Sequence, residues 1–260
     1  MRLRIGQPVN ATDGAFGELA DIVVDPQLLT VTNVVVQPEH RHRQARLVPV
    51  WLLKEEDGTL FVNLDVAHFD RLERVSFSDY VTLDEPIDLG DTWDLGTEDV
   101  LSTPYLYGPY VGYEFDMGWY DDRVGISYDR IPKCDCEIRR SSEVATSNDK
   151  IVGHVEGLVS DDEHITAVVV GVGIPGFRHD VLVPLGAVAK VRNDRIELSI
   201  SEEQFDLLPS TDVLGHPDDL SSHVTDLQQR AEAIAAKLAT RGRSLITEAK
   251  SRVTTRTENR

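Results

Sequence analysis

Cysteine is scarce in this chain: the 260 residues include two, Cys134 and Cys136, separated by a single residue. Two cysteines this close in sequence have poor geometry for a disulfide that cross-links the fold. Two cysteines are also far too few for a disulfide-rich secreted protein. Structural zinc usually takes four ligands with two residues between paired cysteines, and His154 and His164 would have to complete such a site. We therefore interpret both cysteines as unconnected residues at the start of a strand and expect no metal or other cofactor.

Long apolar runs are also missing. The longest candidate, residues 168–175, has eight residues and includes two glycines, whereas a helix that spans a bilayer needs roughly 20 apolar residues. The first five residues lead straight into polar and turn-forming residues, without the hydrophobic region of a signal peptide. We expect a cytoplasmic protein without a transmembrane segment.

Basic residues are few relative to acidic ones. The chain has 26 Lys and Arg against 45 Asp and Glu, for a formal net charge of -19. Such a charge keeps a protein soluble but repels the phosphate backbone of nucleic acids. Nucleic acid is therefore not an expected partner.

The most informative feature present is a self-similarity at an offset of 134 to 136 residues. The offset is 136 at both ends of the repeat and smaller between them, as loop insertions in a duplicated domain would produce. The matched residues are Asp13/Asp149, Gly17/Gly153, Asp25/Asp161, Thr32/Thr166, 34–36/168–170, Pro49/Pro184, Phe69/Phe205, Asp70/Asp206 and Leu72/Leu208. The sequence thus predicts two copies of one domain, in residues 1–75 and 138–209.

Each copy consists of short runs of β-forming residues separated by turn signals. Gly17 and Gly153 interrupt such runs and predict bulges that help a small barrel to close. Pro49 and Pro184 lack an N–H and are expected at a sheet edge or a strand start. The expected strands are 16–24, 31–36, 47–51 and 60–64 in the first copy, and 152–159, 165–172, 181–185 and 196–200 in the second. This spacing is typical of a small barrel or sandwich.

Residues 76–137 have a different composition, with fifteen acidic and three basic residues. Aromatic residues gather within this segment, so a plain solvated linker does not account for it. We expect these rings to pack on a barrel or to bind a partner. The candidate partner-binding aromatics are Tyr105, Tyr107, Tyr110 and Trp119.

Residues 218–255 have the pattern of an amphipathic helix. Its apolar stripe, at alternating spacings of 4 and 3, comprises Leu220, Val224, Leu227, Ala231, Ile234 and Leu238. Such a stripe needs a surface that buries it, and docking on a barrel, self-association and partner binding stay open as alternatives.

Both copies resemble the PRC-barrel family, the small β-barrel of the cytoplasmic part of the photosynthetic reaction-centre H subunit and of a bacterial ribosome maturation factor. The layout is similar to that of two-barrel proteins of actinobacteria, which have a stretch like residues 127–132 before the second barrel. The resemblance implies an all-β fold: two small PRC-type barrels related by internal duplication, an acidic aromatic linker and a C-terminal α-helix. It implies a docking module with no catalytic residue, and the transmembrane helix of the reaction-centre subunit has no equivalent here. The motifs that carry it are 13–17, 21–25, 34–36 and 47–50 in the first copy, and 149–153, 155–161, 166–170 and 181–185 in the second.

Few residues outside these motifs are candidates for binding or catalysis. A basic cluster, His40, Arg41, His42 and Arg43, is a candidate contact for an anionic partner, although a solvated hairpin tip explains it more simply. The repeated aspartates at turns are interpreted as acceptors of backbone hydrogen bonds rather than as acid–base pairs.

These observations favour a non-enzymatic module for protein–protein interaction, an adaptor that self-associates through the tail helix. One alternative is a protein, or an enzyme, that binds a small ligand or anion in the groove between the barrels. A weaker alternative is association with the ribosome or RNA, which the acidic charge disfavours.

Overall fold

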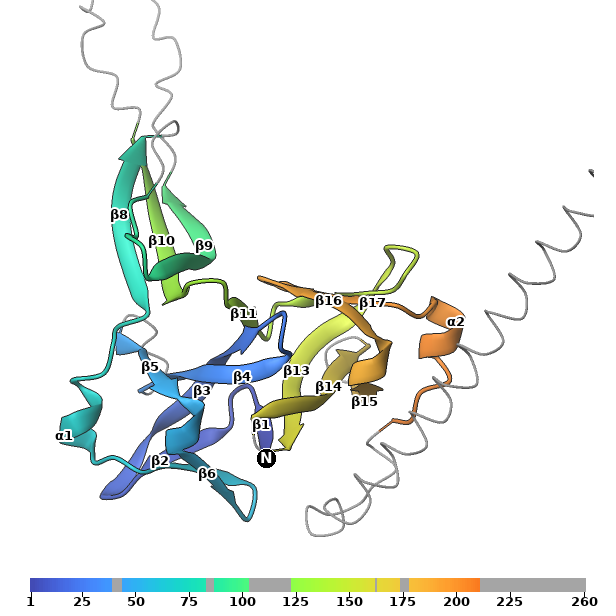
Figure 1. Ribbon diagram of the computed structural model, residues 1–260, viewed down its shortest axis with the longest axis horizontal. Coiled ribbons are helices and arrows are strands. Elements are labelled where there is room, and N and C mark those ends of the chain that lie inside the picture. Colours follow the sequence, from blue (N-terminus) through green and yellow to red (C-terminus); the bar gives the residue numbers. More distant parts are fainter. Residues whose placement is uncertain (39–43, 83–86, 103–122, 162, 174–177, 211–260) are drawn as a thin grey trace, which may run out of the picture.

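The computed structural model describes residues 1–38, 44–82, 87–102, 123–161, 163–173 and 178–210 (Figure 1). Most of these residues lie in strands, which form a 14-stranded sheet and a separate three-stranded sheet. The prediction of a mainly β fold is confirmed. Across these ranges, no helix has both the length and the apolar character needed to cross a membrane.

The same order of elements occurs twice along the chain. The first unit (residues 8–69) comprises β2 (Pro8–Ala11), β3 (Gly14–Asp25), β4 (Thr30–Gln37), β5 (Arg46–Pro49), η2 (Val50–Leu52), β6 (Leu53–Glu56), β7 (Thr59–Val62) and α1 (Val66–Phe69). The second unit (residues 143–205) comprises β12 (Glu143–Ala145), β13 (Ile151–Asp161), β14 (His164–Val172), β15 (His179–Pro184), η3 (Leu185–Ala187), β16 (Val188–Arg192), β17 (Arg195–Leu198) and α2 (Glu202–Phe205).

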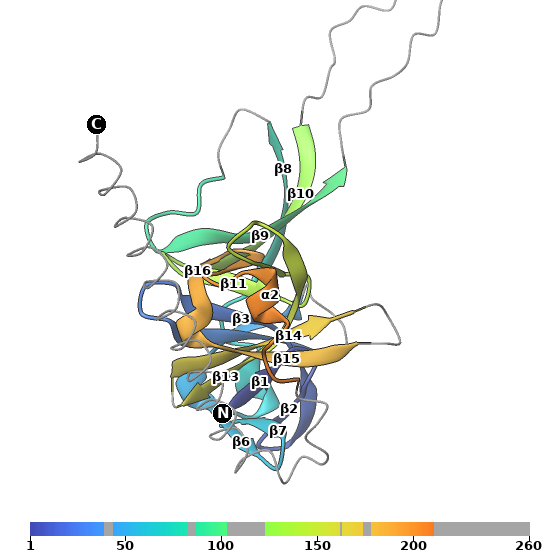
Figure 2. The same ribbon diagram turned by 90° about the vertical axis from the view of Figure 1, so that its right-hand side faces the viewer.

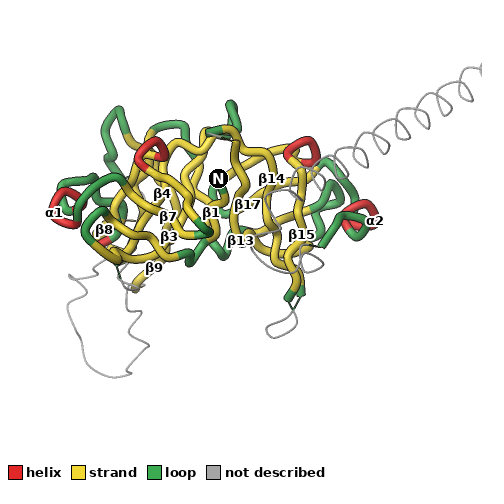
Figure 3. The backbone as a smooth tube through the Cα atoms, turned by 90° about the horizontal axis from the view of Figure 1, so that it is seen from below, coloured by secondary structure: helices red, strands yellow, loops and turns green. Residues whose placement is uncertain are grey.

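Strand pairing within the two units is also the same. In the first unit β3 pairs antiparallel with β2 and β4, β4 with β5, and β6 with β7, while β2 and β7 pair in parallel. Each of these pairings has its counterpart among β12 to β17. Figure 3 shows the two units side by side, with the N-terminus between them.

Two short strands are exchanged between the units. β1 (Arg2–Arg4) precedes the first unit but pairs antiparallel with β13 of the second, where Leu3 faces Leu158. β11 (Cys136–Arg139) precedes the second unit but pairs with β3 of the first, where Ile138 faces Ile22. Two separate copies of one domain, as the sequence predicts, would each keep their own strands, and the exchange departs from this expectation.

Two further backbone hydrogen bonds link the units and are related by an approximate twofold symmetry. The Val31 amide donates to the Glu163 carbonyl at 2.8 Å, and the Ile165 amide donates to the Leu29 carbonyl at 3.0 Å. These two bonds are related by the offset of 134 residues, so each unit supplies the same groups to the other.

One hydrophobic core cluster runs through both units and through the exchanged strands. Leu3 and Ile138 belong to it together with aliphatic residues such as Ile22, Val34 and Leu158, and these five side chains are at most 1% exposed. Burying one side chain of this size contributes about 1.5–3 kcal/mol relative to leaving it in water. The units therefore share apolar packing as well as backbone hydrogen bonds.

The predicted bulges are confirmed. The register between β2 and β3 shifts beside Gly17, and that between β12 and β13 shifts beside Gly153. A Cβ at Gly17 would lie 2.1 Å from the Gln37 carbonyl oxygen, so this close approach requires glycine. Pro49 and Pro184 end β5 and β15, each of which forms a ladder with only one other named strand, in line with the expected edge position.

Part of the acidic segment 76–137 forms the three-stranded sheet, for which the composition of the segment gave no indication. β8 (Ser76–Thr82), β10 (Arg123–Pro132) and β9 (Trp93–Ser102) pair antiparallel in that order, and Figures 1 and 2 show them projecting from the first unit. Fully buried Ile131 packs in one cluster with residues of the first unit such as Val23 and Val35. The Arg130 guanidinium lies 4.6 Å from the ring centroid of Phe77 and 4.4 Å from that of Trp93.

The predicted site residues all lie outside the described ranges. These are the basic cluster His40, Arg41, His42 and Arg43, the aromatics Tyr105, Tyr107, Tyr110 and Trp119, and the helical stripe Leu220, Val224, Leu227, Ala231, Ile234 and Leu238. The C-terminal helix as a whole is therefore left as a prediction.

Candidate functional site

A groove with a volume of about 730 Å³ lies where the two units meet. The first unit contributes η2 and β6 to it, and the second contributes the end of β13 and the start of β14. The lining residues are Met1, Val50, Trp51, Leu53, Lys54, Glu55, Glu56, Asp161, Glu163 and His164. The exchanged strands β1 and β11 join the two units whose residues form the walls of this groove.

Trp51 is the most exposed large hydrophobic side chain in the part of the chain that the structure describes, at 72%. It lies in η2, where Val50 is buried beside it, so the backbone under the indole is anchored in the core. Exposed aromatic rings in a groove are common anchors for a partner. Four carboxylates line the same groove, those of Glu55, Glu56, Asp161 and Glu163, against a single lysine.

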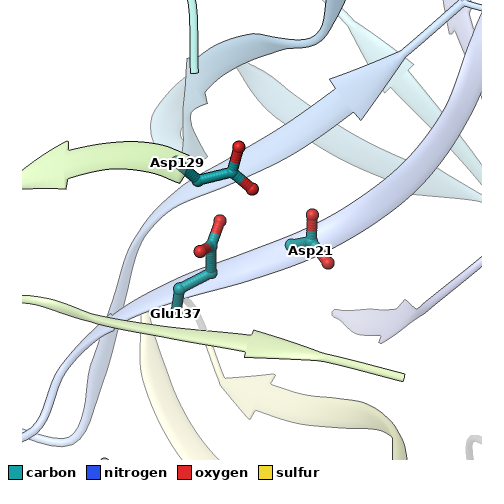
Figure 4. Close-up of side chains that lie close together, drawn as sticks. All are labelled: Asp21, Asp129 and Glu137. Atoms are coloured by element: carbon teal, nitrogen blue, oxygen red, sulfur yellow. The ribbon is translucent and has the colours of Figure 1, made fainter. Parts of the chain in front are cut away.

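A second polar site lies where the first unit, the three-stranded sheet and β11 meet. Its residues, here called the acidic triad, are Asp21 on β3, Asp129 on β10 and Glu137 on β11. Each offers a carboxylate oxygen, and these oxygens all lie within 4.8 Å of one another. Figure 4 shows the three side chains gathered from separate strands, with the Glu137 carboxylate next to that of Asp129.

All three carboxylates are removed from solvent, with Asp21 and Asp129 4% exposed and Glu137 0% exposed. Thr97 on β9 donates two hydrogen bonds of 2.8 Å to Glu137 Oε2, from its amide and from its hydroxyl. The other oxygen, Glu137 Oε1, has no hydrogen-bond partner among the residues that the structure describes. A buried carboxylate oxygen without a partner is costly, because its lost hydration is not replaced.

Asn193 fixes the backbone around the triad. Its side-chain oxygen accepts a 2.8 Å hydrogen bond from the Glu137 amide, and its side-chain nitrogen donates to the carbonyls of Leu95 and Gly96, both at 2.9 Å. A Cβ at Gly96 would lie 2.5 Å from Glu137 Oε2, so glycine there lets β9 approach the carboxylate. The second unit thus holds β9 against β11.

Burial, together with the negative charges of Asp129 and Asp21, raises the pKa of Glu137 from 4.5 to about 8, while the Thr97 hydrogen bonds act in the opposite direction. Arg139 also interacts electrostatically with Asp21 and Glu137. Its guanidinium, however, is already engaged by Asp194 at 3.1 Å and by Asp99 at 3.6 Å. Arg139 is therefore shared between the triad and these two carboxylates.

The residues weighed earlier as ligands or acids do not join this site. Both cysteines are free, Cys134 is exposed, and the Cys136 thiol faces the Val191 carbonyl at 3.9 Å. Asp13 and Asp25 accept backbone hydrogen bonds, from Val66 and from Gln27 and Leu28. For these two aspartates, the interpretation as turn residues is confirmed.

The triad was missed because none of its members repeats between the copies. At the offset of 136, Asp21 corresponds to Gly157, and at 135, Glu137 corresponds to Arg2. A signal was nonetheless present, since Asp21 interrupts an apolar strand pattern at a position where the other copy has no side chain. Departures from a repeat, rather than matches, mark this site.

Comparison with known families gives one finding: residues 140–205 match the PRC-barrel domain. The match covers the second unit from β12 to α2. A PRC-barrel domain is a small β-barrel module, in agreement with the expected resemblance for this part of the chain. No curated protein matches the chain.

Proposed function

We propose that the chain is a non-enzymatic interaction module built from two PRC-type barrels of one duplicated sequence. The family match covers only the second unit. The identical order and pairing of elements in the first unit, together with the sequence offset of 134 to 136, support extending that assignment to both. In this proposal the linker and tail contribute additional contact surfaces.

The observation that carries the proposal is the exposed Trp51 in a groove rimmed by carboxylates from both units. The face of an indole ring attracts Lys and Arg side chains, and neighbouring carboxylates strengthen the attraction. We infer that the groove binds a lysine- or arginine-bearing segment of a protein partner. The carboxylates of the groove would repel a small anion, which disfavours the anion-binding alternative.

Replacing Trp51 with alanine should weaken binding of a basic peptide at least tenfold, because the indole supplies the main contact surface. A suitable probe is a synthetic peptide that copies residues 241–260, which contain six Lys or Arg and two acidic residues. Fluorescence anisotropy with a protein of residues 1–215 would measure the affinity without competition from the chain's own tail.

The matched control is Leu207→Ala, which removes another exposed hydrophobic side chain, 63% exposed, outside the groove. It should bind the peptide as the wild type does. A charge-reversed peptide with Glu at the six basic positions should not bind. Equal affinities for the wild type and Trp51→Ala would contradict the assignment of the groove.

The tail helix is proposed to set the oligomeric state. Its apolar stripe has the spacing of a helix interface, and three heptads are marginal as an isolated helix. Light scattering after size exclusion should give a multiple of the chain mass for the full-length protein and the monomer mass for residues 1–215. Identical oligomeric states for both would remove the oligomerising role of the tail.

A further inference from the structure

The buried carboxylates at the junction of the first unit, the small sheet and β11 are not explained by docking at the groove. Three acids from three separate strands lie within 4.8 Å of one another and are nearly or fully buried. Acidic residues are rarely buried unless their charge is compensated. The question is what compensates these three.

Glu137 supplies the decisive detail. Its side chain is fully buried, and its two oxygens differ: Oε2 accepts two hydrogen bonds from Thr97, whereas Oε1 accepts none from the described part of the chain. The carboxylate points toward that of Asp129 (Figure 4), and an ionised aspartate carries no donor group. A positive group at this point would satisfy Oε1 and offset the mutual repulsion of the triad.

We propose that Asp21, Asp129 and Glu137 form a binding site for a divalent cation, with Ca²⁺ preferred over Mg²⁺. Oxygen ligands from carboxylates suit both ions. Mg²⁺ usually keeps several water molecules, which suits a buried site poorly, whereas Ca²⁺ accepts several carboxylates in a flexible geometry. The Thr97 hydroxyl, 3.5 Å from Asp129 Oδ2 and 2.8 Å from Glu137 Oε2, is a further oxygen at the site.

A polar depression of the surface lies beside residues that adjoin the triad. The depression is lined by Glu98 and Asp99, which follow Thr97 on β9, and by Arg139, two residues beyond Glu137. Asn193, whose side chain holds the Glu137 amide, lines the same depression. Four carboxylates and two arginines line the depression, so it favours cations at the surface beside the triad.

The bound cation would tie three parts of the protein together. Asp21 belongs to the first unit, Asp129 to the small sheet, and Glu137 to the exchanged strand before the second unit. Occupancy would therefore stabilise the placement of the small sheet and of β11 at once. This role is independent of the groove, and Trp51→Ala should leave it unchanged.

The test is thermal unfolding of the full-length protein, first stripped with EDTA and then supplied with 1 mM CaCl₂ or 1 mM MgCl₂. Calcium should raise the melting temperature of the wild type by about 5 °C, because a ligand that binds only the folded state stabilises it. Glu137→Gln should abolish the shift, since the amide keeps the shape but loses the charge. Calorimetric titration of the stripped protein with CaCl₂ should show saturation at one ion per chain.

The matched control is Glu203→Gln, which makes the same change at an exposed position on α2 and should keep the full calcium shift. Asp129→Asn is a second triad variant in case Glu137→Gln folds poorly. The proposal is overturned if neither ion shifts the melting temperature of the wild type. It is equally overturned if Glu137→Gln shows the same shift, because the ion would then act on the general negative charge of the chain.

Discussion

Replacing Gly157 with alanine should lower the free energy of unfolding by about 3 kcal/mol or more. A Cβ at this position would lie 2.2 Å from the Leu3 carbonyl oxygen and 3.0 Å from the Arg4 Cα, both backbone atoms of β1. Backbone cannot rotate away as a flexible side chain does, so the methyl group would displace β1 from β13. Chemical denaturation of the two proteins measures the difference.

Gly186→Ala provides the control for this prediction within the same unit. Gly186 lies in η3, and a Cβ there would meet no atom within 4 Å. Alanine at such a site reduces the freedom of the unfolded chain and should be neutral or slightly stabilising. If Gly157→Ala unfolds at the same denaturant concentration as Gly186→Ala, β1 does not occupy the position described.

Glu137 should make the cation-free protein less stable as the pH rises. The pKa of its carboxyl is about 8 in the fold, because of burial and then the charges of Asp129 and Asp21, against an ordinary value of 4.5. Below pH 4.5 the group is protonated in both states; between 4.5 and 8 the folded state retains the proton that the unfolded chain releases. The free energy of unfolding contributed by this group therefore falls across that window, by a few kcal/mol in total.

Denaturation in EDTA at pH 5, 6, 7 and 8 would measure this loss. The informative quantity is the difference between the wild type and Glu137→Gln, because other titrating groups are common to both. The amide cannot ionise, so the variant should lose less stability than the wild type as the pH rises. Parallel pH profiles for the two proteins would contradict the assignment of the raised pKa to Glu137.

The strands of the two units were largely predictable from local sequence. Runs such as 31–36 and 165–172 are rich in valine and are bounded by turn residues, and β4 and β14 occupy nearly the same residues. The bulges followed from Gly17 and Gly153, because a glycine inside a strand leaves room for a close backbone approach. Propensity and turn chemistry agree with the fold at these positions.

The strand exchange was not predictable in the same way. β1 has three residues, two of them arginine, and β11 has four, so neither shows a clear alternating pattern. Since the two units present similar edges, local sequence does not decide which unit each short strand joins. That choice depends on the length of chain before each unit and on how the units pack together.

The small sheet illustrates a different reason for failure. Val124, Ile126 and Tyr128 alternate along β10 and pack together on one face, which is a strand pattern that the sequence contains. The high acidic content of the surrounding segment indicates a solvated region, and this alternation was therefore not interpreted as a strand. The acidic triad arises only when β3, β10 and β11 come together; the sequence marks Asp21 as a departure from the repeat but does not show which acids join it.

Methyl–methyl contacts measured by NMR in the full-length protein test the reciprocal pairing of β1 and β11 most directly. With labelled Ile, Leu and Val methyl groups, we expect nuclear Overhauser effects between Leu3 and Leu158 and between Ile22 and Ile138, the facing pairs of the two exchanged strands. Contacts from Leu3 to Ile22 and from Ile138 to Leu158, with the expected pairs missing, would mean that each unit keeps its own first strand, and would contradict the account.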